Sequence, residues 1–238
     1  MIILLGLNGY LNGCTALLVV VFCASLAIGF YIRAIKLDAK LLKWGAGMGL
    51  FAGLLWLGPT TDFLLVLTTE NHISYYFNTS MYGVLSYIWV GPSFICGIYV
   101  GSELIAPEKK KALFALFIPL AITFTIVLII DQENTFTFTT NEGDLIDSQF
   151  VYLSPSFILI SIFLTFILVF NGLGALNKAT KTTGEIRKRF LYLTFTFFLF
   201  VVVAVFDAFI DASVFEILYI VRLSMICCAW STYLALKP

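Results

Sequence analysis

Histidine is almost absent from this chain, and the motifs that usually hold metal ions are missing. His72 is the only histidine, and none of the five cysteines forms a Cys-x-x-Cys pair. Most transition-metal sites in proteins are built from clusters of these two residue types. The sequence also offers no histidine base and no thiol nucleophile with a base beside it. We therefore expect no metal site, no cofactor and no enzymatic activity.

Charged residues are also scarce. They make up 12% of the chain, against 61% hydrophobic residues, and the mean hydropathy is +1.00. Soluble domains are about half apolar and a quarter charged. This composition indicates an integral membrane protein, with the lipid bilayer as its main partner and no nucleic acid.

Seven apolar runs are long enough to cross a bilayer, for which about 20 residues are needed. They are too long and too continuous for the strands of a membrane barrel. The sequence therefore predicts an all-α membrane protein, a seven-transmembrane helix bundle that forms a single domain over residues 1–238. The expected spans are Leu11–Ile32, Trp44–Leu67, Met81–Ser102, Ala112–Ile130, Val151–Leu173, Phe190–Ile210 and Phe215–Leu236.

Basic residues gather on one side of this predicted bundle. All but one of the 14 Lys and Arg residues fall in the first, third and fifth connections or after the last span. Because Lys and Arg favour the cytoplasmic side, we expect an outside N-terminus and a cytoplasmic C-terminus in the cell membrane. Ten of the 14 acidic residues lie at or near the opposite side, where they would attract cations.

The exception is Arg222, which lies inside the last span. A charge inside hydrocarbon costs about 2.5 kcal/mol or more unless it finds a partner or water. Asp207 and Asp211 lie one helical turn apart just before it, and Asp62 is expected at a comparable depth. Two alternatives stay open: Arg222 and Asp207 lock the last two helices together, or they form the floor of an outward-facing ligand pocket. The pocket would have aromatic walls from Trp56, Trp89 and Tyr219.

Two predicted helices carry rows of glycine. Gly45, Gly49 and Gly53 repeat at four-residue spacing in the second span, and Gly97 and Gly101 do so in the third. Such faces let helices approach closely in lipid. They favour tight packing within the bundle, with a homodimer interface as the alternative.

Several single residues carry further predictions. Pro59 and Pro92 are expected to bend their helices, because proline breaks the backbone hydrogen-bond ladder. Asn78 begins an Asn-Thr-Ser glycosylation sequon in a loop on the outer side. All five cysteines fall within spans and are interpreted as small buried thiols.

The span lengths, the short cytoplasmic loop after the third span, the basic stretch Gly184–Leu191 and the short final hairpin form a pattern. This pattern resembles the seven-helix membrane sensor module at the N-terminus of prokaryotic histidine kinases. The resemblance implies a receptor in signal transduction. Since the sequence has no apparent effector domain, signalling would need a separate membrane or cytoplasmic protein partner.

The leading hypothesis is thus a receptor-like or sensor-like module with an outward-facing pocket among helices two, three, six and seven. The alternative is a non-catalytic structural or accessory subunit of a larger membrane assembly. A cation channel or transporter is the third hypothesis, suggested by the acidic outer side.

Overall fold

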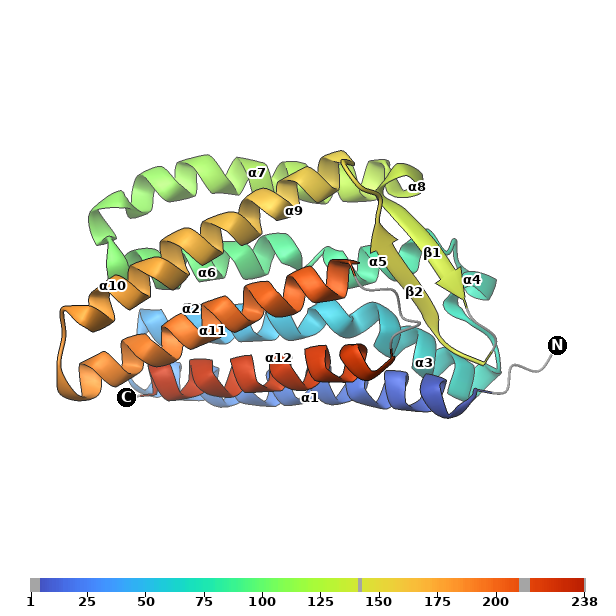
Figure 1. The fold of residues 1–238 in the computed structure, drawn as a ribbon, viewed down its shortest axis with the longest axis horizontal. Coiled ribbons are helices and arrows are strands. Elements are labelled where there is room, and N and C mark those ends of the chain that lie inside the picture. The colour runs from blue at the N-terminus through green and yellow to red at the C-terminus, as the bar shows by residue number, and fades with distance from the viewer. Residues whose placement is uncertain (1–4, 141–142, 210–214, 238) are drawn as a thin grey trace.

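A computed structural model of the protein describes residues 5–140, 143–209 and 215–237. Long helices lie side by side in an elongated bundle (Figure 1). Within the described residues, seven helical spans are long and apolar enough to cross a membrane. The all-α class and the seven spans predicted from the sequence are therefore confirmed.

Three of the spans are broken into shorter helices. The first four spans comprise α1 (Leu7–Lys36), then α2 (Lys40–Gly53), η1 (Leu54–Trp56) and α3 (Leu57–Thr69), then α5 (Ser80–Tyr87) and α6 (Val90–Ile105), then η2 (Pro107–Lys109) and α7 (Lys110–Ile130). The last three comprise α9 (Pro155–Phe166), η3 (Ile167–Leu173) and α10 (Gly174–Thr180), then α11 (Gly184–Phe209), then α12 (Phe215–Leu236).

Proline explains two of the breaks. Pro59 has no N–H for the carbonyl one turn before it, and the chain tightens into the 3-10 segment η1 there. Pro92 has the same effect on the third span, which is interrupted at residues 88 and 89. A helix break thus lies just before each of the two prolines, whereas the predicted bends stay predictions. The third break, the π-helical turn η3, was not predicted, and Pro119 leaves α7 continuous.

One end of the bundle is covered by a β-hairpin, which the sequence analysis did not predict. Strand β1 (Phe136–Thr140) pairs antiparallel with β2 (Ile146–Phe150), and the short helices α4 (Ile73–Tyr76) and α8 (Gln132–Thr135) lie at the same end (Figure 1). Phe136 and Phe150 bury their rings against Tyr87, with ring centroids 5.4 and 4.5 Å away. We call this the hairpin end. The opposite, basic end contains the connections at residues 37–39, 106–109 and 181–183.

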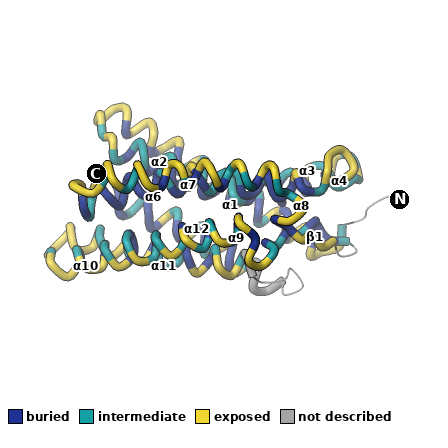
Figure 2. The backbone as a smooth tube through the Cα atoms, turned by 90° about the horizontal axis from the view of Figure 1, so that it is seen from above, coloured by how far each residue is buried: buried dark blue, intermediate teal, exposed yellow. Residues whose placement is uncertain are grey.

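The core is aromatic and the outer faces of the helices are apolar. Phe94 lies at its centre, with the rings of Phe163 and Phe117 at 4.2 and 5.2 Å. Exposed positions run along the outside of the bundle (Figure 2), and many carry large apolar side chains such as Ile122 and Leu223. In water such a surface would aggregate, whereas in a bilayer it faces lipid.

Candidate functional site

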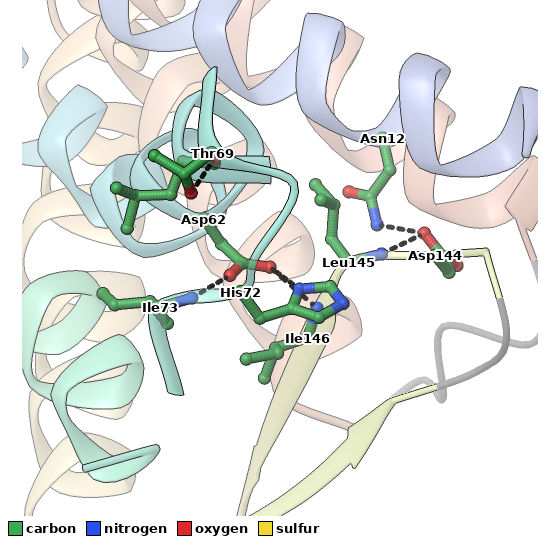
Figure 3. A network of polar contacts seen from close by, with 9 residues as sticks. Asn12, Asp62, Thr69, His72, Ile73, Asp144, Leu145 and Ile146 are labelled. Atoms are coloured by element: carbon green, nitrogen blue, oxygen red, sulfur yellow. Dashed lines mark hydrogen bonds and ion pairs between the residues drawn. The ribbon is translucent and has the colours of Figure 1, made fainter. Parts of the chain in front are cut away.

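Asp62 is the centre of a polar network at the hairpin end (Figure 3). Its side chain is fully buried, with 0% exposure. One carboxylate oxygen accepts the backbone N–H of Ile73 at 2.8 Å. The other accepts the N–H of Ile146 at 3.1 Å and lies 2.9 Å from Nδ1 of His72. Asp62 therefore joins α3 to α4 and to strand β2, and both of its oxygens are occupied.

A second network joins the first helix, the last helix and the hairpin. Arg222 is 3% exposed and donates from one guanidinium nitrogen to the backbone carbonyl of Asn12 and to Oγ1 of Thr15, the latter at 2.9 Å. The Asn12 amide donates to Oδ1 of Asp144 at 3.3 Å, and this oxygen also accepts the N–H of Leu145 at 2.7 Å (Figure 3). One guanidinium nitrogen of Arg222 thus finds its acceptors on α1, whereas Nε is buried without a hydrogen-bond partner among the described residues.

The sequence predicted that Arg222 pairs with Asp207, but the hydrogen bonds of Arg222 go to α1 instead. Among the ion pairs of the described residues, none within 4.0 Å includes Arg222. Asp62 belongs to the separate network above, and Asp211 lies outside the described residues. Arg222, Asp207 and Asp62 therefore do not form one cluster of direct contacts.

Asp207 instead faces an internal cavity, here called the Asp207 cavity. Its volume is about 50 Å³, and it lies between spans two, three, five and six. The wall is almost entirely apolar, and Asp207 is the one acidic residue among the described residues that line it. The lining includes Trp56, Tyr87, Ser93, Phe163, Phe200 and Asp207.

The breaks in three helices meet at this cavity. Leu55 and Trp56 belong to η1, Tyr87 and Val90 flank the interruption of the third span, and Ile167 begins η3. Irregular backbone at membrane depth occurs where it is buried in protein or lines a cavity. Two of the sequence-predicted ligand residues, Trp56 and Asp207, therefore line a cavity whose walls contain three helix breaks.

A second cavity lies closer to the basic end, here called the Cys228 cavity. Its volume is about 40 Å³. It shares Ser93, Ile167 and Phe200 with the wall of the Asp207 cavity. Thr196 lines it and is 4% exposed, and its hydroxyl has no hydrogen-bond partner in the described part of the chain.

Trp89 and Tyr219 are not brought into either cavity. The indole of Trp89 stacks on Phe51, with centroids 5.9 Å apart. Its N–H and the hydroxyl of Tyr219 are buried and have no hydrogen-bond partner among the described residues. The predicted ligand residues are thus distributed over several places rather than one pocket.

The glycine rows contact neighbours inside the bundle. A side-chain carbon at Gly45 would come 2.5 Å from Leu236, and one at Gly53 would collide with Cys23. In the third span, Gly101 and Gly97 face Asn171 of η3, whose amide donates to the Gly97 carbonyl at 3.0 Å. Gly49 has no such neighbour within 4 Å and lines the Cys228 cavity.

Two predictions about single residues have different outcomes. Asn78, the sequon asparagine, is exposed in the connection between α4 and α5, and its glycosylation stays a prediction. The interpretation of all five cysteines as buried thiols was wrong for two of them. Cys14 and Cys227 are exposed on the outside of the bundle, whereas Cys23, Cys96 and Cys228 are buried.

The partners of the charged residues were not predicted from the sequence. His72 was given no role, and Asn12, Thr15 and Asp144 were not singled out. Polar residues within apolar runs, such as Asn12, could have indicated these partners, because a buried polar side chain needs a hydrogen-bond partner.

Comparisons with protein-family models, with curated proteins and with solved structures find no match to this chain.

Proposed function

We propose that the protein is a receptor-like membrane module that binds a small, mainly apolar molecule carrying a cationic or hydrogen-bonding group. The Asp207 cavity supports this proposal best. Ligand pockets in proteins are typically apolar with a few polar groups that fix orientation. An apolar cavity with one carboxyl group in its wall has this character.

The size of the cavity indicates how binding would act. An engineered cavity that admits benzene has a volume of about 150 Å³, whereas this one has about 50 Å³. A ligand of more than a few atoms must therefore push the walls apart. Because η1, the third-span interruption and η3 lie in those walls, the widening would occur at the helix breaks.

Such widening couples binding to a change of shape. A ligand shifts the equilibrium between a narrow and a widened state of the cavity only by the difference in its binding free energy for the two states. A ligand that fits only the widened cavity binds the widened state alone. Bending of spans two, three and five would then move their segments at the basic end, where a cytoplasmic partner would read the change.

The accessory-subunit alternative has less support. It relied on free small-residue faces, but Gly45, Gly53 and Gly101 already contact residues inside the bundle. Copurification with a stoichiometric companion protein would nevertheless favour it over the receptor proposal.

The test compares alkylammonium ions with alcohols of the same chain length in thermal-shift measurements on the purified protein. We expect the cations to raise the melting temperature and the alcohols to have little effect. Asp207→Asn should remove the response, whereas Glu133→Gln, which removes an exposed carboxylate at the hairpin end, should preserve it. An equal response of the Asp207→Asn variant, or no response of the wild type, would refute the proposal.

A further inference from the structure

Two cysteines and two methionines line the Cys228 cavity in the middle of the bundle. Cys23 comes from α1, Met48 from α2, and Met225 and Cys228 from α12. Each is at most 9% exposed. Two thiols and two thioethers therefore line one enclosed space of about 40 Å³.

Contacts within the bundle hold these four side chains in place. Met225 and Cys228 are three residues apart, so they lie on the same face of α12. Cys23, Met225 and Cys228 belong to one buried cluster in contact. Met48 reaches the cavity from the opposite side, where its sulfur packs at the Gly97 position of α6.

We propose that the Cys228 cavity is a binding site for a soft monovalent metal ion, Cu(I). Thiolate and thioether sulfur are the ligand types that favour Cu(I). A water molecule needs about 10–15 Å³ of cavity volume, so the available 40 Å³ accommodates a metal ion without displacing a helix. Within the described residues, no group of three or more His, Cys, Asp or Glu side chains could hold a metal. The proposed site therefore depends on methionine sulfur in addition to cysteine.

Charge balance favours a monovalent ion. A net charge buried in this environment is costly. When Cu(I) binds, the S–H bond of Cys23 breaks, a sulfur–copper bond forms and the proton leaves to the medium. The cavity then has the same net charge as before, and copper stays in its +1 state. Zn(II) would require two thiolates for the same balance, and methionine is not among its usual ligands.

The second thiol keeps its proton. Cys228 donates its S–H to the carbonyl oxygen of Thr196 at 3.8 Å. The thiolate, not the thiol, is the form of cysteine that binds metals. We therefore assign Cys23 as the thiolate ligand and Met48 and Met225 as neutral thioether ligands, with Cys228 in the wall beside them. The site is separate from the ligand site at Asp207 and does not depend on it.

The experiment is a competition titration of the purified protein with the Cu(I) complex of bicinchoninate, under anaerobic reducing conditions. We expect one Cu(I) per chain and the release of about one proton per metal bound. Ag(I), which needs no reductant, should raise the melting temperature of the same sample. Zn(II) at equal concentration should not.

The chain provides matched controls for the two cysteines and for Met225. The double variant Cys23→Ser, Cys228→Ser should lose the one-to-one binding, whereas Cys14→Ser, Cys227→Ser, at the two exposed thiols, should keep it. Met225→Leu conserves volume and should fold. It should weaken binding at least about tenfold, the scale on which even the surroundings of metal ligands act. Met81→Leu, at an exposed methionine, is its control.

Three results would overturn the proposal. One is Cu(I) binding by the Cys23→Ser, Cys228→Ser variant that matches the wild type. Another is equal loss in the exposed-thiol control. The third is Zn(II) binding in preference to Cu(I), which would contradict the assignment of a monovalent soft metal.

Discussion

The substitution Asp62→Asn tests the polar network at the hairpin end. Both carboxylate oxygens of Asp62 accept hydrogen bonds from N–H groups: one from Ile73, the other from Ile146 and His72. An asparagine has one oxygen and one NH₂ group. In either orientation, the NH₂ group would face a backbone N–H donor, and at least one buried donor would lose its acceptor.

The expected cost follows from the kind of bond that is lost. Hydrogen bonds to charged groups contribute about 1.5–3 kcal/mol, and a buried donor without a partner costs about 1–3 kcal/mol. We expect a loss of about 3 kcal/mol, confined mainly to the hairpin and α4, because the helices of the bundle keep their own contacts. Local opening at these elements should therefore become roughly 100-fold more frequent, since 1.4 kcal/mol corresponds to a factor of ten.

Amide hydrogen exchange measures this effect residue by residue. The amides of Ile73 and Ile146 should exchange about 100 times faster in Asp62→Asn, while those in the middle of α7 should be unchanged. Asp131→Asn is the matched control, because among the described residues Asp131 accepts the exposed side-chain amide of Asn134, at 2.7 Å, and no buried backbone N–H. Unchanged protection of Ile73 and Ile146 in Asp62→Asn would refute the reasoning.

Three further predictions concern helix packing and buried polar contacts, each measured as the free energy of unfolding in detergent or bilayers. Gly53→Ala should cost about 1–3 kcal/mol, because the added methyl group would collide with α1. Gly49→Ala, with open space beside it, should be neutral or stabilising. An equal cost at both positions would contradict the packing argument. Asn171→Leu should cost about 1 kcal/mol, since it removes the amide that η3 donates to a carbonyl of α6; an unchanged unfolding free energy would count against it. Thr15→Val should cost about 1.5–3 kcal/mol, because it removes an acceptor from a buried guanidinium. Arg222→Met removes the charge together with its need for a partner and should cost less. A larger loss in Arg222→Met than in Thr15→Val would show that this view of the network is mistaken.

Hydropathy was sufficient to predict the bundle, because a spanning helix has to be apolar along its whole length. The breaks at Pro59 and Pro92 were predictable for a similar reason: the missing N–H acts on the same helix. The π-helical η3 has no comparable residue, and its position next to Gly97 reflects packing between two spans.

The hairpin and the polar partners illustrate what sequence patterns alone leave open. The alternation of Phe and Thr at residues 136–139 is a strand signal, but it lies in a loop that the composition marks as polar. His72 reaches Asp62 because the chain reverses at Glu70, which has a φ of 58°. The spacing of Asp207 and Arg222 along the last helical hairpin predicted an ion pair between them. The structure gives Arg222 closer acceptors on α1, from the opposite end of the sequence.

The contact between Arg222 and Asn12 joins residues 210 positions apart. During synthesis, α1 is made well before α12, so this contact cannot form until α12 has been made. Until then the Thr15 hydroxyl can donate to the carbonyl of Leu11 in its own helix, a bond of 2.8 Å in the structure. When Arg222 inserts, its acceptors are already in place. The contact that joins α12 to α1 therefore has to follow the synthesis of every span between them.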